Sequence, residues 1–240
     1  MPLELVHSDL AKANIASISG GKYILTFKDD ATSHGTVFIL VNKQLSTVLK
    51  AFKAYQAWAE HQSGWQIKEL RVDRGKEYMG EMLKYIKSQG IEYNPTAGYS
   101  PQSNGIADRM NHILFEAACT MLDAAEAHLD LWGEAILAVC HIQNRFPSRI
   151  LGKTSHEAWT GKKPTVRHIR KWECKVYCHI NKKTGRTKLD TKLMGGFLVG
   201  YESRNIYRIY YLDTKEFKIL RDVIFSENQF FNIRHVESED

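Results

Sequence analysis

The order of the short apolar runs near the start of the chain is the feature that most constrains the fold. Three runs rich in β-branched and aromatic residues are set apart by glycines and precede the first helical pattern: residues 3–10, 22–28 and 36–41. That helical pattern, with Ser46 as a candidate cap, covers about residues 46–61 and leads to a fourth apolar run at 65–72. A strand that lies parallel to an earlier one needs such a helical crossover. The order therefore predicts an α/β fold with a mixed sheet flanked by helices.

Helices dominate the next part of the chain. A helix is expected through Met82 and Ile86, then a brief strand at 91–93, a loop at 95–103, a long helix, and another helix at about 131–144. In the long helix, Asp108 falls opposite an apolar stripe spaced at about 100° per residue. The predicted stripe consists of Ile106, Met110, Ile113, Leu114, Ala117 and Met121, and the opposite side carries Asn104, Asp108, Asn111 and His112.

Three carboxylates stand where predicted elements begin or end. Asp9 is on the first strand, Asp73 follows the fourth, and Asp108 is one turn into the long helix. The first and fourth strands can be neighbours in a mixed sheet, which would bring Asp9 and Asp73 together. Hard divalent cations take oxygen ligands and assist phosphoryl chemistry, so these residues form a candidate metal site. Spacing alone is weak evidence, because the chain holds 27 Asp and Glu residues.

Charge is distributed unevenly along the chain. The net charge is +6, yet residues 1–150 carry 15 Lys and Arg against 16 Asp and Glu, whereas residues 151–240 carry 18 against 11. Eleven Lys and Arg lie from Lys162 to Lys192, with Glu173 and Asp190 as the acidic residues among them. This density suits a polyanion such as nucleic acid, although a solvated basic linker has the same composition.

The region after residue 150 has a β-rich pattern. Strands are expected at 176–180, 197–201, 206–212 and 217–225, with Tyr and Phe side chains serving as core more readily than as base-stacking surfaces. Cys174 and Cys178 with His179 fit an alternating strand better than a zinc site. The expected organisation is a core at 1–150, a basic linker at 151–175, a small β-rich domain at 176–230 and a disordered acidic tail at 231–240. Without a membrane-length apolar run or a secretory signal, we expect an intracellular protein and no membrane partner.

Ordered motifs extend over most of the chain. In the first part they are His7-Ser8-Asp9-Leu10, Asp73-x-Gly75-x-Glu77-Tyr78, Pro101-Gln102-x-Asn104-Gly105-x-Ala107-x-Arg109, Trp132-x-Glu134-Ala135 and Asn144-Arg145-x-Pro147. In the second part they are Glu157-Ala158-Trp159-x-Gly161-Lys162-x-Pro164, Lys188-Leu189-Asp190, Phe197-Leu198-Val199-Gly200-Tyr201 and Arg221-Asp222-Val223-Ile224-Phe225. The first set resembles the integrase core of copia-type long-terminal-repeat retrotransposon Pol polyproteins, and the second resembles the segment that follows it. Several motifs in one order are more specific than any one of them.

The resemblance implies a ribonuclease-H-like fold of the retroviral integrase superfamily. It implies an enzyme that trims the 3′ ends of element DNA and joins them to target DNA, with Asp9, Asp73 and Asp108 as catalytic and metal-binding residues. The implied cofactor is Mg²⁺, for which Mn²⁺ can substitute. It further implies a nuclear location and a homo-oligomer. The implied nucleic-acid contacts are Asn104, Arg109, Lys162, Lys163, Arg167, Arg170, Lys171, Lys182, Lys183, Arg186 and Lys188.

Three positions depart from the family pattern. The third acidic position is ordinarily Glu, and Asp108 reaches about 1.5 Å less far, where misplacement near 1 Å can cost roughly a hundredfold in rate. Arg74 replaces an Asn, and Trp172-Glu173 replaces an aromatic-glycine pair. We therefore expect impaired integrase activity. The alternatives are a catalytically inactive nucleic-acid-binding module and a ribonuclease-H-type nuclease that cuts RNA in a hybrid.

Overall fold

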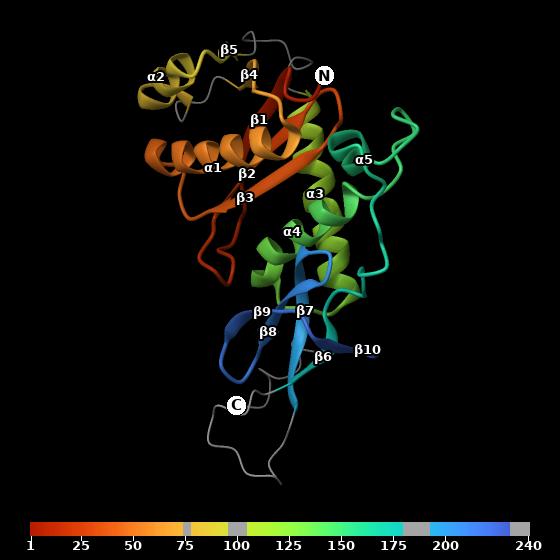
Figure 1. Ribbon diagram of the computed structural model, residues 1–240. Coiled ribbons are helices and arrows are strands. Elements are labelled where there is room, and N and C mark those ends of the chain that lie inside the picture. The colour runs from red at the N-terminus through yellow and green to blue at the C-terminus, as the bar shows by residue number, and fades with distance from the viewer. Residues whose placement is uncertain (74–77, 96–104, 180–192, 231–240) are drawn as a thin grey trace. The chain divides into compact units, whose positions relative to one another are not determined.

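The protein is described by a computed structural model that covers residues 1–73, 78–95, 105–179 and 193–230 (Figure 1). The chain divides into two compact units: unit 1 comprises Met1–Ala117 and Val139–Pro164, and unit 2 comprises Ala118–Ala138 and Thr165–Asp240. Most of the predicted loop at 95–103 and the whole predicted tail at 231–240 lie outside the described residues. Across the described ranges, no helix is both long and apolar enough to span a membrane.

A five-stranded mixed sheet forms the centre of unit 1. Its strands are β1 (Leu5–Lys12), β2 (Tyr23–Asp29), β3 (Gly35–Leu40), β4 (Glu69–Val72) and β5 (Glu92–Pro95). They lie in the order β3-β2-β1-β4-β5. The first three strands are mutually antiparallel, whereas β4 runs parallel to β1 and β5 runs parallel to β4. The predicted mixed sheet with a helical crossover to the fourth strand is confirmed.

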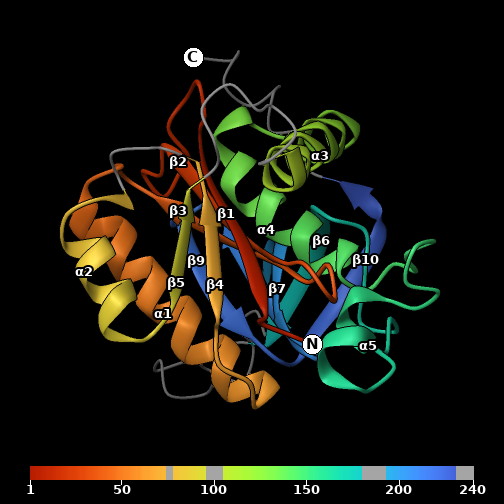
Figure 2. The same ribbon diagram turned by 90° about the horizontal axis from the view of Figure 1, so that it is seen from above.

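Two helices cover one face of this sheet, as Figure 2 shows: α1 (Leu45–Ser63) and α2 (Glu81–Ser88). Buried apolar side chains of both helices pack on the strands; Phe27 of β2 stacks on Tyr55 of α1 at 4.2 Å between ring centroids. The predicted cap at Ser46 was wrong, because α1 begins at Leu45. The N-cap residue is Gln44, two residues before Ser46, and the Asn42 side-chain oxygen accepts the Gln44 N–H at 3.0 Å.

Gly35 is the contact point for helical residues on the opposite face. The side chain of Asn144, just after α4 (Trp132–Gln143), accepts the Gly35 N–H at 2.9 Å and donates to its carbonyl at 2.8 Å. Met110 of α3 (Gly105–Ala124) fills the space where a Gly35 side chain would stand, only 2.5 Å from an added Cβ. A glycine at this position therefore allows the helices to approach the sheet.

The buried stripe of α3 is rotated from the predicted one. Ile106 and Ile113, expected in the core, are 38% and 43% exposed. Asn111, expected on the polar side, is only 5% exposed. The side chains of α3 that are buried are Ala107, Met110, Asn111, Leu114, Ala118 and Leu122. An apolar residue count could not reveal this rotation, because a polar side chain with a buried hydrogen-bond partner occupies one of the core positions.

Part of the predicted linker at 151–175 is folded into unit 1. Residues Ser155–Thr160 form helix α5, and the Thr154 hydroxyl caps it by accepting the Glu157 N–H at 3.0 Å. Trp159 of α5 is buried and stacks on His34 at 5.0 Å and on Trp58 at 5.9 Å between ring centroids. The Glu157-Ala158-Trp159 motif thus supplies core packing, and the linker in its predicted form does not begin at residue 151.

An antiparallel sheet forms most of unit 2. Its strands are β6 (Cys174–His179), β7 (Leu193–Ser203), β8 (Ile206–Tyr211), β9 (Glu216–Leu220) and β10 (Val223–Phe230), in the order β10-β6-β7-β8-β9. The β-rich prediction is confirmed, although the predicted strand at 217–225 is two strands separated at Arg221 and Asp222. Cys174 and Cys178 are buried free thiols of β6, and Tyr207 and Tyr211 are core side chains, as expected.

Two glutamates of unit 2 are buried. Glu134, in the first turn of α4, has an oxygen 2.8 Å from Nε of Arg208 on β8, and 4% of the residue is exposed. Glu173 is fully buried and has φ of 60°, in the left-handed region that glycine favours. The family pattern has glycine at this position. Here a glutamate adopts the left-handed conformation, which costs a non-glycine residue free energy.

Candidate functional site

Strands β1 and β4 bring two of the predicted carboxylates together. Their parallel register runs from Leu5 opposite Glu69 to Ser8 opposite Val72, and β4 ends there. Asp9 and Asp73 each follow the last pair of this register directly, so the two carboxylates lie on adjacent strands at the same end of β4. Asp9 is half-buried within β1, whereas Asp73 is exposed just beyond the end of β4.

The first turns of α3 lie next to Asp9. Asn111 Nδ2 donates a hydrogen bond to Asp9 Oδ2 at 2.6 Å, across 102 positions of sequence. Asp108 is exposed one turn earlier on the same face of the helix. The sequence reasoning missed Asn111, although its spacing of three residues from Asp108 was a signal that both would face the same site.

Electrostatics link the three carboxylates. The pKa of Asp9 is raised from 3.8 to about 6. Burial is the largest cause, and the negative charges of Asp108 and Asp73 also raise it. Hydrogen bonds from the Leu10 backbone and from Asn111 act in the opposite direction, because they favour the charged carboxylate. Asp9 therefore experiences the negative charge of both partners.

The carboxylates do not by themselves make a closed metal cage. Within the described ranges, no group of three or more His, Cys, Asp and Glu side chains is close enough to hold a metal ion. The donor set nevertheless suits a hard cation: two carboxylate charges act on the half-buried Asp9, and the buried Asn111 Oδ1 has no hydrogen-bond partner among the residues described. A positive ion among these oxygens would offset the repulsion that raises the pKa of Asp9.

Cationic residues lie beside the carboxylates on the same side of the sheet. His7 is two positions before Asp9, so both side chains point to one face, and its cross-strand neighbours are Lys28 and Arg71. His7 Nε2 lies 3.0 Å from an oxygen of Asp30, and burial lowers the pKa of His7. Burial also lowers the pKa of Lys28, and the charge of Arg109 lowers it further. Lys28 and Arg71 were not identified from the sequence.

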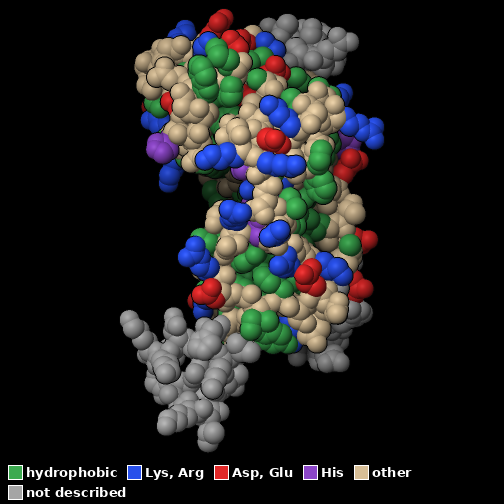
Figure 3. All heavy atoms as spheres, turned by 45° about the vertical axis from the view of Figure 1, so that its right-hand side comes forward, with side chains coloured by type: hydrophobic (Ala, Val, Ile, Leu, Met, Phe, Trp, Pro, Cys, Tyr) green, Lys and Arg blue, Asp and Glu red, His purple; other side chains and the backbone are tan. Residues whose placement is uncertain are grey.

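The predicted nucleic-acid contacts are divided between the two units. Arg109, Lys162 and Lys163 are exposed in unit 1. In unit 2, Arg167 and Lys171 are exposed and Arg170 is partly buried beside Glu227. On the face of the molecule in Figure 3, Lys and Arg side chains are scattered among acidic and uncharged ones. Five predicted contacts lie outside the described residues: Asn104, Lys182, Lys183, Arg186 and Lys188.

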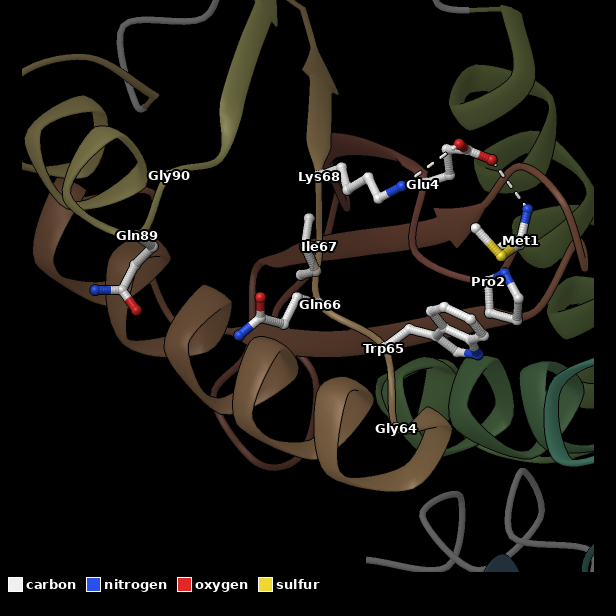
Figure 4. Close-up of a pocket in the computed structure, with 10 residues that line it drawn as sticks. All are labelled: Met1, Pro2, Glu4, Gly64, Trp65, Gln66, Ile67, Lys68, Gln89 and Gly90. Atoms are coloured by element: carbon white, nitrogen blue, oxygen red, sulfur yellow. Dashed lines mark hydrogen bonds and ion pairs between the residues drawn. The ribbon is translucent and has the colours of Figure 1, made fainter.

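A separate groove of about 520 Å³ lies at the beginning of β4, at the strand end opposite Asp73 (Figure 4). The side chain of Trp65 borders it and is 44% exposed. Glu4 is the acidic residue in its lining, and its carboxylate is paired with Lys68 at 3.7 Å and with the N-terminal amino group at 3.0 Å. The acidic residue of this groove is therefore already in ion pairs, and the groove lies apart from Asp9 and Asp73.

The β-rich part of unit 2 is similar to a known family. Residues 174–239 match the family described as "Retroviral polymerase SH3-like domain". This stretch contains the antiparallel sheet from β6 to β10.

Similar sequences extend over nearly the whole chain. The chain is 36% identical over 231 residues to the "Retrovirus-related Pol polyprotein from transposon TNT 1-94" of Nicotiana tabacum, covering 95% of this chain and 17% of that protein. It is 26% identical over 231 residues to the corresponding polyprotein from transposon RE1 of Arabidopsis thaliana, covering 95% of this chain and 16% of that protein. The chain thus spans about a sixth of the length of these relatives.

Solved structures with a similar fold are retroviral integrase catalytic cores. The catalytic core domain of BIV integrase matches with a TM-score of 0.51 and 15% identity, over 66% of this chain and 95% of that one. The catalytic core domain of HTLV-2 integrase, solved in complex with magnesium in a trimeric form, matches with a TM-score of 0.52 and 14% identity, over 66% and 97%. At these identities the likeness concerns the fold.

Proposed function

Because this chain is homologous to a segment of the retrovirus-related Pol polyproteins of plant copia-like transposons and has the fold of a retroviral integrase catalytic core, we propose that it catalyses DNA integration. The proposed reactions are metal-dependent processing of the 3′ ends of element DNA and transfer of those ends to a target strand. The observation that supports the proposal is the environment of Asp9: β4 runs parallel to β1 and ends just before Asp73, Asn111 of α3 donates a hydrogen bond to Asp9, and the charges of Asp108 and Asp73 raise its pKa.

The three carboxylates would hold the cofactor. Asp9, Asp73 and Asp108 are the proposed ligands of Mg²⁺, with Mn²⁺ as a substitute, and the bound ion would activate the attacking oxygen and stabilise the leaving oxygen of a phosphodiester. Asn111 orients Asp9 by its hydrogen bond and favours the ionised form that a cation requires. The HTLV-2 integrase core was solved in complex with magnesium, which supports the choice of ion by analogy.

Positive side chains near the carboxylates would hold the DNA backbone. Arg109 follows Asp108 directly, and its charge reaches Lys28 across the sheet face. Such cations bind phosphates without reading sequence, so they would position the scissile strand and not select it. We further propose that the protein acts as a homo-oligomer, which light scattering on the purified chain tests directly.

The aspartate at position 108 should limit the rate. It stands one methylene short of the glutamate that the family carries, so Asp108→Glu is expected to raise strand joining while leaving DNA affinity unchanged. A specific observation favours the alternative of an inactive nucleic-acid-binding module: within the described part of the chain, no three potential ligands approach closely enough to hold a metal ion.

Strand joining on a short duplex with an element end separates these functions. The assay uses Mg²⁺ and then Mn²⁺, and compares the native chain with Asp73→Asn and Asp108→Glu. Joining that Asp73→Asn abolishes supports the integrase proposal. DNA binding without joining in every variant, Asp108→Glu included, would refute it and favour the binding module. Cleavage of an RNA–DNA hybrid with no action on duplex ends would instead indicate a ribonuclease-H-type nuclease.

A further inference from the structure

Unit 2 contains a cavity whose lining is rich in arginine. Its volume is about 330 Å³, and it lies between the segment that precedes β6 and the turn that joins β7 to β8. No Asp or Glu is among its lining residues, which include Arg167, His168, Arg170, Arg204, Asn205 and Tyr207. We call this feature the arginine cavity.

Aromatic packing makes one wall of the arginine cavity rigid. Tyr207 is 6% exposed, and its hydroxyl donates to the His168 carbonyl at 3.3 Å. Its ring packs edge-on against Phe225 at 4.9 Å and against Tyr201 at 6.4 Å between centroids. The hydroxyl of Tyr201 donates to the Arg170 carbonyl at 2.7 Å, which ties the segment before β6 to the sheet. The cavity is therefore a built feature of the sheet and not a gap between loose loops.

One of the three arginines shapes the cavity. The Nη1 of Arg170 donates to the carbonyls of Arg167 at 2.6 Å and Ile169 at 3.0 Å. Its Nε lies 3.5 Å from a Glu227 oxygen, and its guanidinium stands over the Phe225 ring at 5.4 Å. Held by these contacts, Arg170 fixes the backbone that carries Arg167.

The other two arginines are available to a ligand. Arg167 and Arg204 are both exposed at the rim. Within the described ranges, the side chains of Arg167 and Arg204 make no hydrogen bond or ion pair. Both arginines line one space, and no carboxylate is among its lining residues in the described part of the chain. A pair of planar guanidinium groups suits the geometry and charge of a phosphate group.

We infer that the arginine cavity binds a phosphodiester group of the DNA backbone through Arg167 and Arg204. The inference rests on the proposed function, because that function makes DNA the polyanion that unit 2 would meet. It extends the function by assigning a defined phosphate site, by adding Arg204 to the DNA-binding residues, and by giving Arg170 the role of a positioning residue.

The test is the salt dependence of DNA binding. Fluorescence anisotropy of a labelled duplex, measured across a range of NaCl concentrations, compares the full chain with Arg167→Gln/Arg204→Gln. Loss of this one phosphate contact should lower the magnitude of the slope of log Kd against log salt by about 0.9. The matched control is Lys215→Gln/Lys218→Gln, which removes the same charge from unit 2 near the other end of β8, where Tyr211 pairs with Glu216. A slope change no larger than that of the control overturns the inference.

Two further measurements keep the result interpretable. If the Gln variant does not fold, Arg167→Lys/Arg204→Lys keeps both charges and loses bidentate donation, so severalfold weaker binding is expected and unchanged binding overturns the inference. A labelled mononucleotide separates free phosphate from backbone phosphate: binding as tight as that of the duplex, and lost in the variant, overturns the assignment to the backbone.

Strand joining on the same samples separates this inference from the proposed function. If the native chain joins DNA and Arg167→Gln/Arg204→Gln binds DNA unaltered, phosphate binding by the arginine cavity is refuted and the proposed function is not. A native chain that neither binds nor joins DNA refutes the proposed function and the inference with it.

Discussion

Replacing Asp9 by Asn should stabilise the protein in the absence of divalent metal, although it removes a proposed catalytic group. The pKa of Asp9 is raised from 3.8 to about 6, first by burial and then by the charge of Asp108. A carboxyl group whose pKa is higher in the folded state ionises first in the unfolded chain, so the folded state loses stability as pH rises between these two values. A shift of about two units corresponds to about 3 kcal/mol, and the loss is complete above pH 6 to 7.

Asparagine has nearly the same shape, stays neutral at every pH, and can accept the Asn111 hydrogen bond through its side-chain oxygen. The free energy of unfolding of Asp9→Asn should therefore exceed that of the native chain by up to about 3 kcal/mol at pH 7 and by about zero at pH 4. Comparing the two proteins at each pH removes the contribution of the other acidic groups, which both share.

Urea unfolding in the presence of EDTA, followed at several pH values between 4 and 7.5, measures this difference. Glu116→Gln is the matched control. Glu116 is an exposed carboxylate of α3, about 12 Å from Asp108 along the helix axis. A repeat with excess Mg²⁺ should raise the stability of the native chain and leave Asp9→Asn unchanged, since a ligand that binds the native state stabilises it. A difference that does not vary with pH, or a less stable Asp9→Asn protein at pH 7, would refute the reasoning.

Three further predictions concern other buried polar groups. Asn111→Ala removes the donor to Asp9 and should raise the pKa of Asp9 further and lower joining by about 10- to 100-fold, measured as a shift in the pH profile of the joining rate together with its maximum. Glu134→Ala leaves Arg208 without its 2.8 Å partner and should lower the free energy of unfolding in urea by about 3 kcal/mol. This is the lower end for buried pairs, because the Arg208 side chain is 27% exposed. Glu134→Met/Arg208→Leu should lower it much less, and equal losses in the two variants would contradict the ion-pair argument. Glu173→Gly should raise the thermal unfolding midpoint of unit 2, because a non-glycine residue at φ of 60° costs roughly 1 to 2 kcal/mol; a lower midpoint would mean that contacts of the buried Glu173 side chain outweigh the backbone strain.

Sequence pattern was sufficient for features that depend on neighbours along the chain. The order of most strands and helices, the β-rich second region, and the positions of Asp9 on a strand, Asp73 after a strand and Asp108 near a helix start follow from local periodicity and from glycine punctuation. A helical crossover allows the fourth strand to lie parallel to the first, as β4 does to β1, and so the sequence already indicated that Asp9 and Asp73 can be neighbours.

Tertiary structure decided everything that depends on contacts between distant segments. Asn111 is buried because Asp9, 102 positions earlier in the chain, accepts its hydrogen bond. The buried face of α3 therefore differs from the face that its apolar residues indicate. Trp159 belongs to the core because His34 and Trp58 offer stacking surfaces. Arg167 and Arg204 meet at one cavity because the β7–β8 turn returns to the segment before β6. Local periodicity reports which side chains share a face, but burial and pairing are set by what that face meets, and that is fixed only when the whole chain has folded.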